Sequence, residues 1–290
     1  MKTNIFLLIP YFSVDMEKYI FFKGEKIFFN DVGEGKVVVL LHGFLGSKEI
    51  WKDVVAELMQ KYRVITIDLP GHGKSGHFGY LHDVELMAEC VKSILKSLRL
   101  KKCFLIGHSM GGYVALAFLE LYPQNLLGLG LINSTAYADS IEKKNDRQRA
   151  IDLVKKSAQV YTSATIKNLF SESNLISKKK EIDFALQIAL STGKRGIIAS
   201  LEGMKVRKDR RKILENSNLP VFFVIGQKDK ILKSEDLMNQ LKFIKNPHTL
   251  ILENDGHLSF LENRPAFIKS LLDYIKESNK KRKKNLITGK

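Results

Sequence analysis

The chain has 290 residues, of which 44% are hydrophobic and 27% charged, and its formal net charge at pH 7 is +16. This composition is ordinary for a globular enzyme and excludes a low-complexity or fibrous chain. Two cysteines are too few for a disulfide framework. A hydrophobic core must therefore hold the fold, and a domain of this length buries about three quarters of its unfolded surface.

The N-terminal segment contains one short apolar run, residues 5–9, which is too short to span a bilayer. Lys2 precedes this run, but residues 10–13 offer no small-residue cleavage site of the kind that ends a secretory signal. We therefore expect a protein that is not exported, that has no integral membrane segment and that works in the cytoplasm.

Apolar runs of strand character alternate with helical patterns along most of the chain. This alternation predicts an α/β fold with a mostly parallel central sheet that helices cover on both faces. The expected strands are 37–41, 64–67, 103–107, 126–132, 220–226 and 248–252, and the expected helices around them are 50–62, 82–98, one that starts near residue 111, and 265–276.

Residues 136–217 break the alternation, because they contain no strand-like run. Their sequence pattern predicts several helices, at 141–156, 164–169, 178–192 and 197–214. The segment lies between two expected strands, so we interpret it as a helical cap inserted into a core made of residues 16–135 and 218–276. A cap at that edge of the sheet covers the site and selects the substrate.

The most informative motif is Gly107-His108-Ser109-Met110-Gly111, a G-x-S-x-G pentapeptide between an expected strand and an expected helix. A chance match is the alternative, because glycine and serine are common. The flanking strand and helix favour a nucleophile elbow, in which a sharp turn exposes the serine hydroxyl at the carboxyl end of the sheet. Ser109 is therefore the candidate nucleophile.

A serine nucleophile needs a base, and the base needs an orienting acid. Asp229 follows the expected strand 220–226, and His257 follows the strand 248–252. Carboxyl ends of parallel strands share one edge, so these side chains can meet Ser109 there. Each one alone fits a turn or surface residue better, but the order serine, acid, histidine favours a triad. Asp255 and Asp236 are the alternative acids; the first lies too near His257 in sequence, and the second sits at a helix start.

The strand 37–41 runs into a glycine-bearing loop that begins His42-Gly43-Phe44. Such a loop can direct backbone N–H groups towards a developing oxyanion. We assign the oxyanion donors to the backbone N–H groups of Phe44 and Met110. His42 and His108 are better explained as structural histidines that bond to nearby backbone.

The excess of positive charge is concentrated in two segments of the chain. Residues 276–290 carry seven lysine or arginine residues and one glutamate, which predicts a disordered, solvated basic tail over 277–290, with weak, salt-sensitive contact to anionic lipid or nucleic acid as the alternative. Residues 205–212 of the cap are also dense in charge and are expected to form a mostly solvated helix face. Arg207 is the candidate there for contact with an acidic substrate.

The spacing of cysteine and histidine residues suggests no metal site, and no glycine-rich loop matches a phosphate cradle, so we expect no cofactor and no specific nucleic-acid partner. Cys90 and Cys103 fall in an expected helix and strand, and neither is placed for catalysis. The expected partner is a small-molecule substrate.

Several segments together resemble the α/β-hydrolases, the group that includes small esterases, lactonases, proline iminopeptidases and carbon–carbon bond hydrolases. The resembling segments are 41–47, 68–75, 107–112, 226–229 and 255–257. The resemblance implies Ser109 as nucleophile, His257 as general base and acid, and Asp229 as the orienting carboxylate. It also implies that 68–75 is a structural loop, and that Met16 is a natural start after a dispensable extension, residues 1–15.

The resemblance implies a serine hydrolase that cleaves a small carboxylic ester, lactone or amide through an acyl-enzyme. A serine at the elbow argues against dehalogenases and epoxide hydrolases of this fold, which carry aspartate there. The alternatives are a lyase or carbon–carbon hydrolase that uses the triad as a base, and a non-catalytic small-ligand receptor. Tyr113 stands where a menaquinone-pathway lyase of this fold carries an arginine, which disfavours that lyase.

Overall fold

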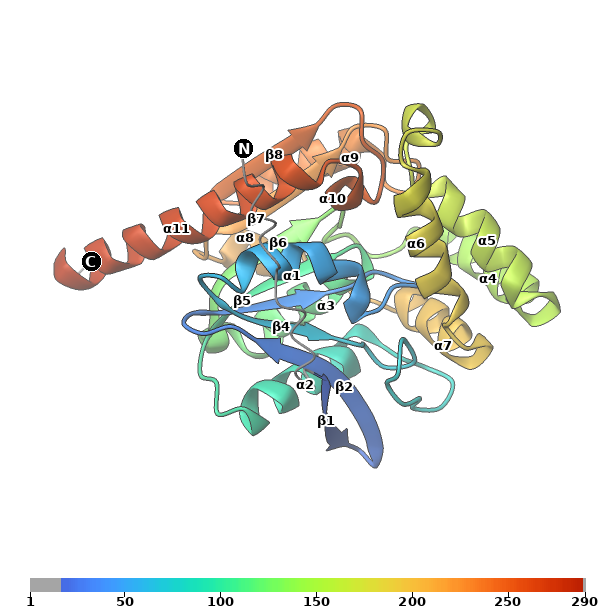
Figure 1. Ribbon diagram of the computed structural model, residues 1–290, viewed down its shortest axis with the longest axis horizontal. Coiled ribbons are helices and arrows are strands. Elements are labelled where there is room, and N and C mark those ends of the chain that lie inside the picture. The colour runs from blue at the N-terminus through green and yellow to red at the C-terminus, as the bar shows by residue number, and fades with distance from the viewer. Residues whose placement is uncertain (1–16, 289–290) are drawn as a thin grey trace, which may run out of the picture.

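A mostly parallel sheet lies at the centre of the molecule. The computed structural model describes residues 17–288, with side chains as far as Lys280, and within them eight strands form one sheet in the order β1-β2-β4-β3-β5-β6-β7-β8 (Figure 1). The strands are β1 (Glu17–Phe22), β2 (Glu25–Val32), β3 (Val37–Leu41), β4 (Arg63–Ile67), β5 (Cys103–His108), β6 (Leu126–Ile132), β7 (Val221–Gly226) and β8 (Pro247–Leu252). From β3 to β8 every pairing is parallel, which confirms the expected sheet, and the six expected strands lie within one residue of their predicted bounds.

Two strands at the start of the described chain have no counterpart among the expected elements. β1 and β2 form an antiparallel hairpin, and β2 pairs antiparallel with β4. Lys23 and Gly24 form the turn with φ of 49° and 88°, as a tight two-residue hairpin requires. That glycine, between runs rich in aromatic and β-branched residues, is the signal that predicts such a hairpin.

Helices cover both faces of the sheet. They are α1 (Lys52–Leu58), α2 (Val84–Ser97), α3 (Met110–Leu121), α4 (Ile141–Lys156), α5 (Ala158–Asn168), α6 (Lys179–Leu190), α7 (Lys194–Lys205), α8 (Arg211–Asn216), α9 (Ser234–Gln240), α10 (Ser259–Glu262) and α11 (Arg264–Thr288). α1 packs against α11, and α2 packs against α3. The four helices α4–α7 lie together at one end of the sheet (Figure 1), where α4 contacts α5 and α7, and α5 contacts α6.

The predicted single helix over 197–214 is wrong in its middle. α7 ends at Lys205 and α8 begins at Arg211, so 206–210 form a connection. The expectation of a solvated face is wrong here for two arginines, since Arg207 and Arg210 are 6% and 2% exposed. Arg210 pairs with Glu85 and Glu120. These buried ion pairs require the chain to leave the helix, and tertiary contacts outweigh helix propensity.

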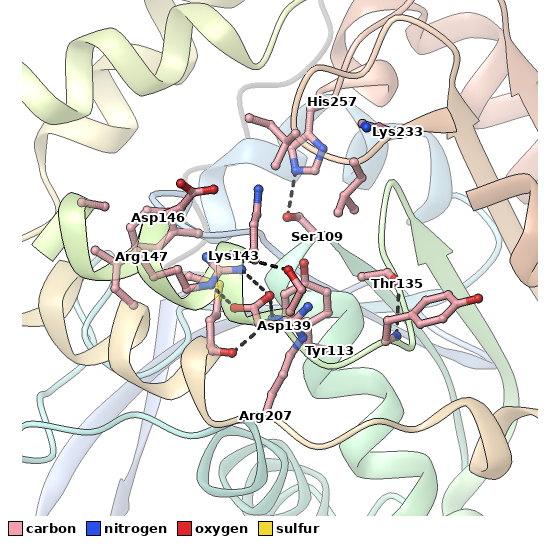
Figure 2. Close-up of a pocket in the computed structure, with 18 of the residues that line it drawn as sticks. Ser109, Tyr113, Thr135, Asp139, Lys143, Asp146, Arg147, Arg207, Lys233 and His257 are labelled. Carbon is pink, nitrogen blue, oxygen red and sulfur yellow. Dashed lines mark hydrogen bonds and ion pairs between the residues drawn. The ribbon is translucent and has the colours of Figure 1, made fainter. Parts of the chain in front are cut away.

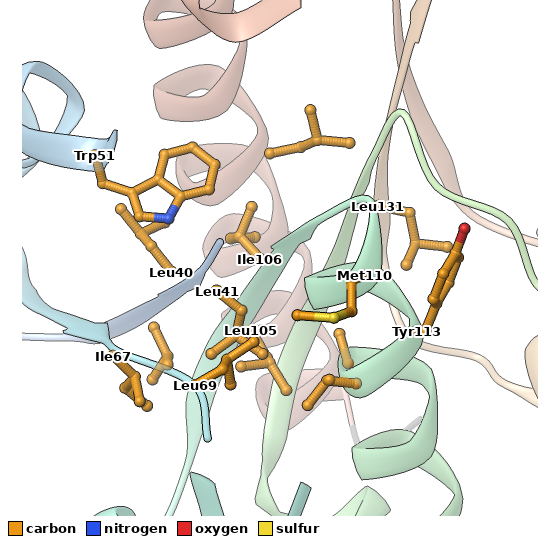
Figure 3. Packing of buried hydrophobic residues seen from close by; sticks show 14 of the residues in the cluster. Leu40, Leu41, Trp51, Ile67, Leu69, Leu105, Ile106, Met110, Tyr113 and Leu131 are labelled. Carbon is orange, nitrogen blue, oxygen red and sulfur yellow. The ribbon is translucent and has the colours of Figure 1, made fainter. Parts of the chain in front are cut away.

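The core lies on both sides of the parallel strands. All five residues of β3 are buried, as expected of a strand covered by helices on both faces. Trp51 is fully buried and stacks on Phe260, with ring centroids 4.4 Å apart. Figure 3 shows the packing of other buried side chains around β3 and β5, with Met110 of α3 close to the strands. The elbow therefore stands on rigid, close-packed elements.

Residues 277–288, which belong to the segment predicted to be a disordered tail, continue the helix α11, which ends at Thr288. No glycine or proline interrupts residues 266–288, and lysine, arginine and leucine favour a helix. The predicted N-terminal extension, residues 1–15, and the proposed start at Met16 lie outside the described residues. Among the described helices, none has the length and apolar character that a bilayer crossing requires.

Candidate functional site

Ser109 occupies the sharp turn between β5 and α3. Its backbone has φ 49° and ψ −115°, a strained conformation for a residue with a side chain. Close packing holds it there: a Cβ atom added to Gly107 would lie 2.1 Å from the carbonyl oxygen of Gly111. Only glycine at 107 permits that approach of strand and helix. The strand, the turn and the helix predicted from the pentapeptide are all present.

The structure brings the three predicted side chains together at the carboxyl ends of β5, β7 and β8. The Ser109 Oγ atom lies 2.8 Å from His257 Nε2 (Figure 2). His257 Nδ1 lies 2.7 Å from Asp229 Oδ2. His257 and Asp229 are 3% and 8% exposed, so little water competes for these hydrogen bonds.

Asp229 is held as a carboxylate. Burial alone would raise its pKa, but the neighbouring His257, together with hydrogen bonds from the Leu232 backbone and the Asn133 side chain, lowers it below the usual value. The Ile231 and Leu232 N–H groups donate to Oδ1 at 2.7 and 3.0 Å. Because a carboxylate only accepts, Nδ1 of His257 carries the proton, and Nε2 is left to accept from the Ser109 hydroxyl.

The alternative acids point elsewhere, as predicted. Asp255 accepts hydrogen bonds from Asn174 at 3.2 Å and Asn263 at 3.4 Å. Asp236 lies in the first turn of α9 and is exposed. Neither carboxylate has a hydrogen bond to His257 within the described chain.

Asn133 lies at the site, although it is not among the residues predicted from the sequence. It has φ 43° directly after β6, and its Nδ2 group donates to Asp229 Oδ2 at 3.0 Å and to the Gly256 carbonyl at 3.2 Å. The Ser259 hydroxyl in turn donates to Asn133 Oδ1 at 2.5 Å. Asn133 therefore fixes both the acid and the loop before His257. A polar residue directly after a buried strand is the signal that identifies it.

The two predicted oxyanion donors lie beside Ser109. A Cβ atom added to Gly43 would be 3.2 Å from the Ser109 Cβ, so the loop that carries Phe44 passes close to Ser109. Met110 is the first residue of α3, and the N–H groups of a first helical turn have no partner within the helix. Within residues 17–288, neither the Phe44 nor the Met110 N–H donates to another protein atom. Phe44 also lines the pocket, whereas the Met110 side chain is buried in the core.

The other histidines near the site are structural, as predicted. The pKa of His108 falls to about 3 through burial, so the neutral ring donates from Nε2 to the His257 carbonyl at 2.9 Å. Burial also lowers the pKa of His42 to about 4. His42 Nε2 accepts from the Leu69 N–H at 3.0 Å. The loop 68–75 is structural too, since the buried Asp68 carboxylate binds the backbone and the ammonium group of Lys48.

A pocket of about 740 Å³ opens above Ser109 and His257. Its walls come from the core and from the helices α4, α5 and α7 (Figure 2). The cap-side lining residues include Arg147, Tyr161 and Leu201. A volume of this size fits a small organic substrate.

Arg207 lines this pocket, but an ion pair with Asp139 already neutralises part of its positive charge. Arg207 Nη1 binds Asp139 and the Met204 carbonyl, and its guanidinium carbon lies 4.1 Å from the centre of the Tyr113 ring. Asp139 also pairs with Arg147. Burial alone would raise the pKa of Asp139, but the two arginines hold it below its usual value. Neither Asp139 nor Arg147 was among the candidates, because nothing in their local sequence marks them.

The described residues contain no group of three or more histidine, cysteine, aspartate or glutamate side chains arranged to hold a metal ion. Cys90 and Cys103 are both buried as free thiols, and burial raises the pKa of the Cys103 thiol to about 12. At neutral pH such a thiol is protonated and a poor nucleophile.

Comparisons with known proteins agree with this geometry. A family model for the alpha/beta hydrolase fold matches residues 36–264. The structure of a thermophilic esterase from Thermogutta terrifontis, with malate bound, is 29% identical and superimposes with a TM-score of 0.86 over 90% of this chain and 98% of that one.

Two curated relatives have different activities. The 2-hydroxy-6-oxononadienedioate/2-hydroxy-6-oxononatrienedioate hydrolase of Escherichia coli K12 is 27% identical over 87% of this chain and 92% of its own length. The dihydrolipoyllysine-residue acetyltransferase component of the acetoin cleaving system of Pseudomonas putida is 29% identical over 84% of this chain, which spans only 65% of that protein. The family model covers most of the sequence, and the protein therefore belongs to the α/β-hydrolase-fold family.

Proposed function

We propose that the protein is a serine hydrolase that cleaves a small carboxylic ester, lactone or amide, with Ser109, His257 and Asp229 as its catalytic triad. The observation that carries the proposal is the continuous series of hydrogen bonds from Ser109 Oγ through both nitrogens of His257 to Asp229. Similarity to the Thermogutta terrifontis esterase supports the ester as the first substrate class to test.

In the proposed mechanism, Ser109 Oγ attacks the substrate carbonyl carbon while His257 Nε2 takes the hydroxyl proton. The Phe44 and Met110 N–H groups stabilise the oxyanion, and each such donor typically contributes about 3–4 kcal/mol. The tetrahedral species expels the leaving group, which His257 protonates. Water, deprotonated by His257, then cleaves the acyl-enzyme. Asp229 stabilises the imidazolium ion that forms in both steps.

The helices α4–α7 and the segments that join them, residues 136–217, form the proposed cap. The pocket lining supports this assignment, because Arg147, Tyr161 and Leu201 come from three of these helices and face the same space as Ser109. The cap excludes water from the acyl-enzyme and limits the size of the substrate. A cytoplasmic location, a small-molecule substrate and the absence of a specific nucleic-acid partner stay predictions.

Covalent labelling by a fluorophosphonate, followed by intact mass, tests the proposal together with hydrolysis of 4-nitrophenyl butyrate. Wild type adds one label, and Ser109→Ala adds none and loses turnover by about 10⁴- to 10⁶-fold. Ser97→Ala, on α2, is the matched serine control and keeps both properties. A folded wild type that neither takes the label nor hydrolyses the ester would overturn the proposal.

Carbon–carbon bond hydrolysis is the second candidate function, and the similarity to the Escherichia coli hydrolase favours it. In that case the triad acts on a hydroxy-oxo-dienedioate such as the one in that enzyme's name, and simple esters are poor substrates. A wild type that cleaves 2-hydroxy-6-oxononadienedioate far faster than 4-nitrophenyl butyrate, in a reaction that His257→Ala abolishes, would replace the esterase proposal.

A further inference from the structure

Two buried arginines share one carboxylate in the wall of the pocket. The side chains of Arg147 and Arg207 are 12% and 4% exposed, and that of Asp139 is 1% exposed. Both guanidinium groups pair with Asp139 (Figure 2). Among the described residues, this cluster therefore keeps an excess of one positive charge. A buried charge without a counter-charge is costly, so the cluster favours an anion beside it.

Arg207 also keeps unused hydrogen-bond donors. An arginine side chain has five N–H groups, and within the described chain Arg207 donates only from Nη1. Its Nε atom is buried and has no partner. The guanidinium carbon lies 4.1 Å from the centre of the Tyr113 ring, so the ring covers one side of the group. The N–H groups of an arginine match a carboxylate or a similar planar anion.

Other charges around the pocket do not cancel this excess. Lys230, Lys233, Glu142 and Asp236 line the rim but are exposed, so water and salt screen them. Asp146 is partly buried and pairs with Arg149. Lys143 adds a further positive charge to the lining, and it has no ion pair within the described residues. The buried wall is therefore more positive than the rim.

The cluster and Ser109 line the same pocket, so one substrate molecule can contact both. Tyr113 follows Ser109 by four residues at the start of α3, which places the two Cα atoms roughly 6 Å apart along the helix axis. Arg207 lies on the Tyr113 ring, and Arg147 and Ser109 line one pocket.

We propose that Arg147 and Arg207 bind a carboxylate of the substrate, so that the protein prefers esters that carry a free carboxylate a few bonds from the scissile carbonyl. Monoesters of short dicarboxylic acids are the simplest members of this class. The inference rests on the proposed serine hydrolase function and adds its substrate class. A purely structural role, in which the ion pairs join the cap to the core, is the alternative that the experiment excludes.

The test compares two esters that differ in charge, 4-nitrophenyl hydrogen glutarate and methyl 4-nitrophenyl glutarate, each corrected for spontaneous hydrolysis. Wild type shows a kcat/KM about 10- to 100-fold higher for the anionic ester, the factor expected from one charge-assisted contact. Equal values, or a preference for the neutral ester, would overturn the inference while the proposed function stands. Absence of both turnover and fluorophosphonate labelling would overturn both.

Variants then separate binding from structure. Arg207→Gln and Arg147→Gln lower kcat/KM for the anionic ester by about 10-fold or more and leave the neutral ester much less affected. Asp139→Asn frees both arginines, so the ratio of anionic to neutral turnover rises. Arg195→Gln, at an exposed position of α7 outside the pocket lining, is the control and leaves the ratio unchanged. Equal losses for both esters in the arginine variants would assign the cluster a structural role only.

Discussion

Asp229 keeps its negative charge inside the protein because every hydrogen bond it accepts favours the carboxylate. His257 and Asn133 bind one oxygen, and the Ile231 and Leu232 N–H groups bind the other. The lowered pKa of Asp229 means that the acid stays ionised through the neutral range. The proposed base therefore keeps the tautomer that accepts a proton from Ser109.

Replacing Asp229 by asparagine tests this role at the scale of one residue. Asp229→Asn preserves shape but cannot hold the proton on Nδ1, so we expect kcat to fall by about 10⁴-fold with little change in KM. The measurement is steady-state hydrolysis of 4-nitrophenyl butyrate. Asp255→Asn is the matched control, because Asp255 is also buried near the loop and contacts Asn174 and Asn263 instead of His257. Equal losses in the two variants would contradict the assigned acid.

The loop that carries His257 is tied to the proposed cap by backbone hydrogen bonds. The His257 N–H donates to the Leu169 carbonyl at 2.8 Å. The buried Glu262 carboxylate accepts from the Gly256 N–H at 2.8 Å, the Ser171 N–H at 2.9 Å and the Asn174 side chain at 2.8 Å. Movement of the segment 169–174 therefore moves the proposed base.

Glu262 is thus a positioning residue at the scale of the element. In Glu262→Gln one oxygen becomes a donor and faces backbone N–H groups, so the loop shifts. We expect kcat to fall by about 10- to 100-fold, as small displacements of a reacting group do. We also expect the unfolding free energy to fall by about 1–3 kcal/mol. Glu277→Gln, on the exposed side of α11, is the control. A variant that loses stability without losing kcat would show that Glu262 does not position the base.

Elements governed by local pattern were predictable, and elements governed by distant partners were not. Buried strands such as 126–132 show as apolar runs, and the elbow shows as a motif with its strand and helix. The break at 206–210 exists because Arg207 and Arg210 pair with Asp139, Glu85 and Glu120, which lie 68 to 125 residues away in the chain. Glu262 likewise contacts residues of the cap. No local pattern predicts which distant acid meets which arginine.

Buried neutral histidines determine how the free energy of unfolding of the whole molecule changes as the pH falls. Burial lowers the pKa of four of them from 6.5 to values between about 3 and 4: His42, His72, His82 and His108. In the unfolded chain these groups take up protons as the pH falls through about 6.5, and in the folded chain they do not. Protonation therefore favours unfolding, by up to about 1.4 kcal/mol per histidine for each pH unit below that value.

The pH range over which stability is lost distinguishes the histidines from the carboxylates as the cause of that loss. Carboxylates with lowered pKa values, such as Asp139 and Asp229, stabilise the fold above their unfolded pKa of 3.8 and lose that contribution only at lower pH. Asp255 and Glu262 have raised pKa values, chiefly through burial. They gain protons in the folded state, which offsets part of the loss.

We therefore expect the unfolding free energy from urea titration to be lower at pH 5 than at pH 7.5 by several kcal/mol. His72→Asn isolates one contribution, because His72 Nδ1 bonds only to the Pro70 carbonyl within the described chain and its Nε2 has no partner there. The variant removes one group that must stay neutral, so its stability depends less steeply on pH, by up to about 1.4 kcal/mol per pH unit. Equal slopes for variant and wild type between pH 5 and 6.5 would show that His72 takes up its proton in the folded state as easily as in the unfolded chain.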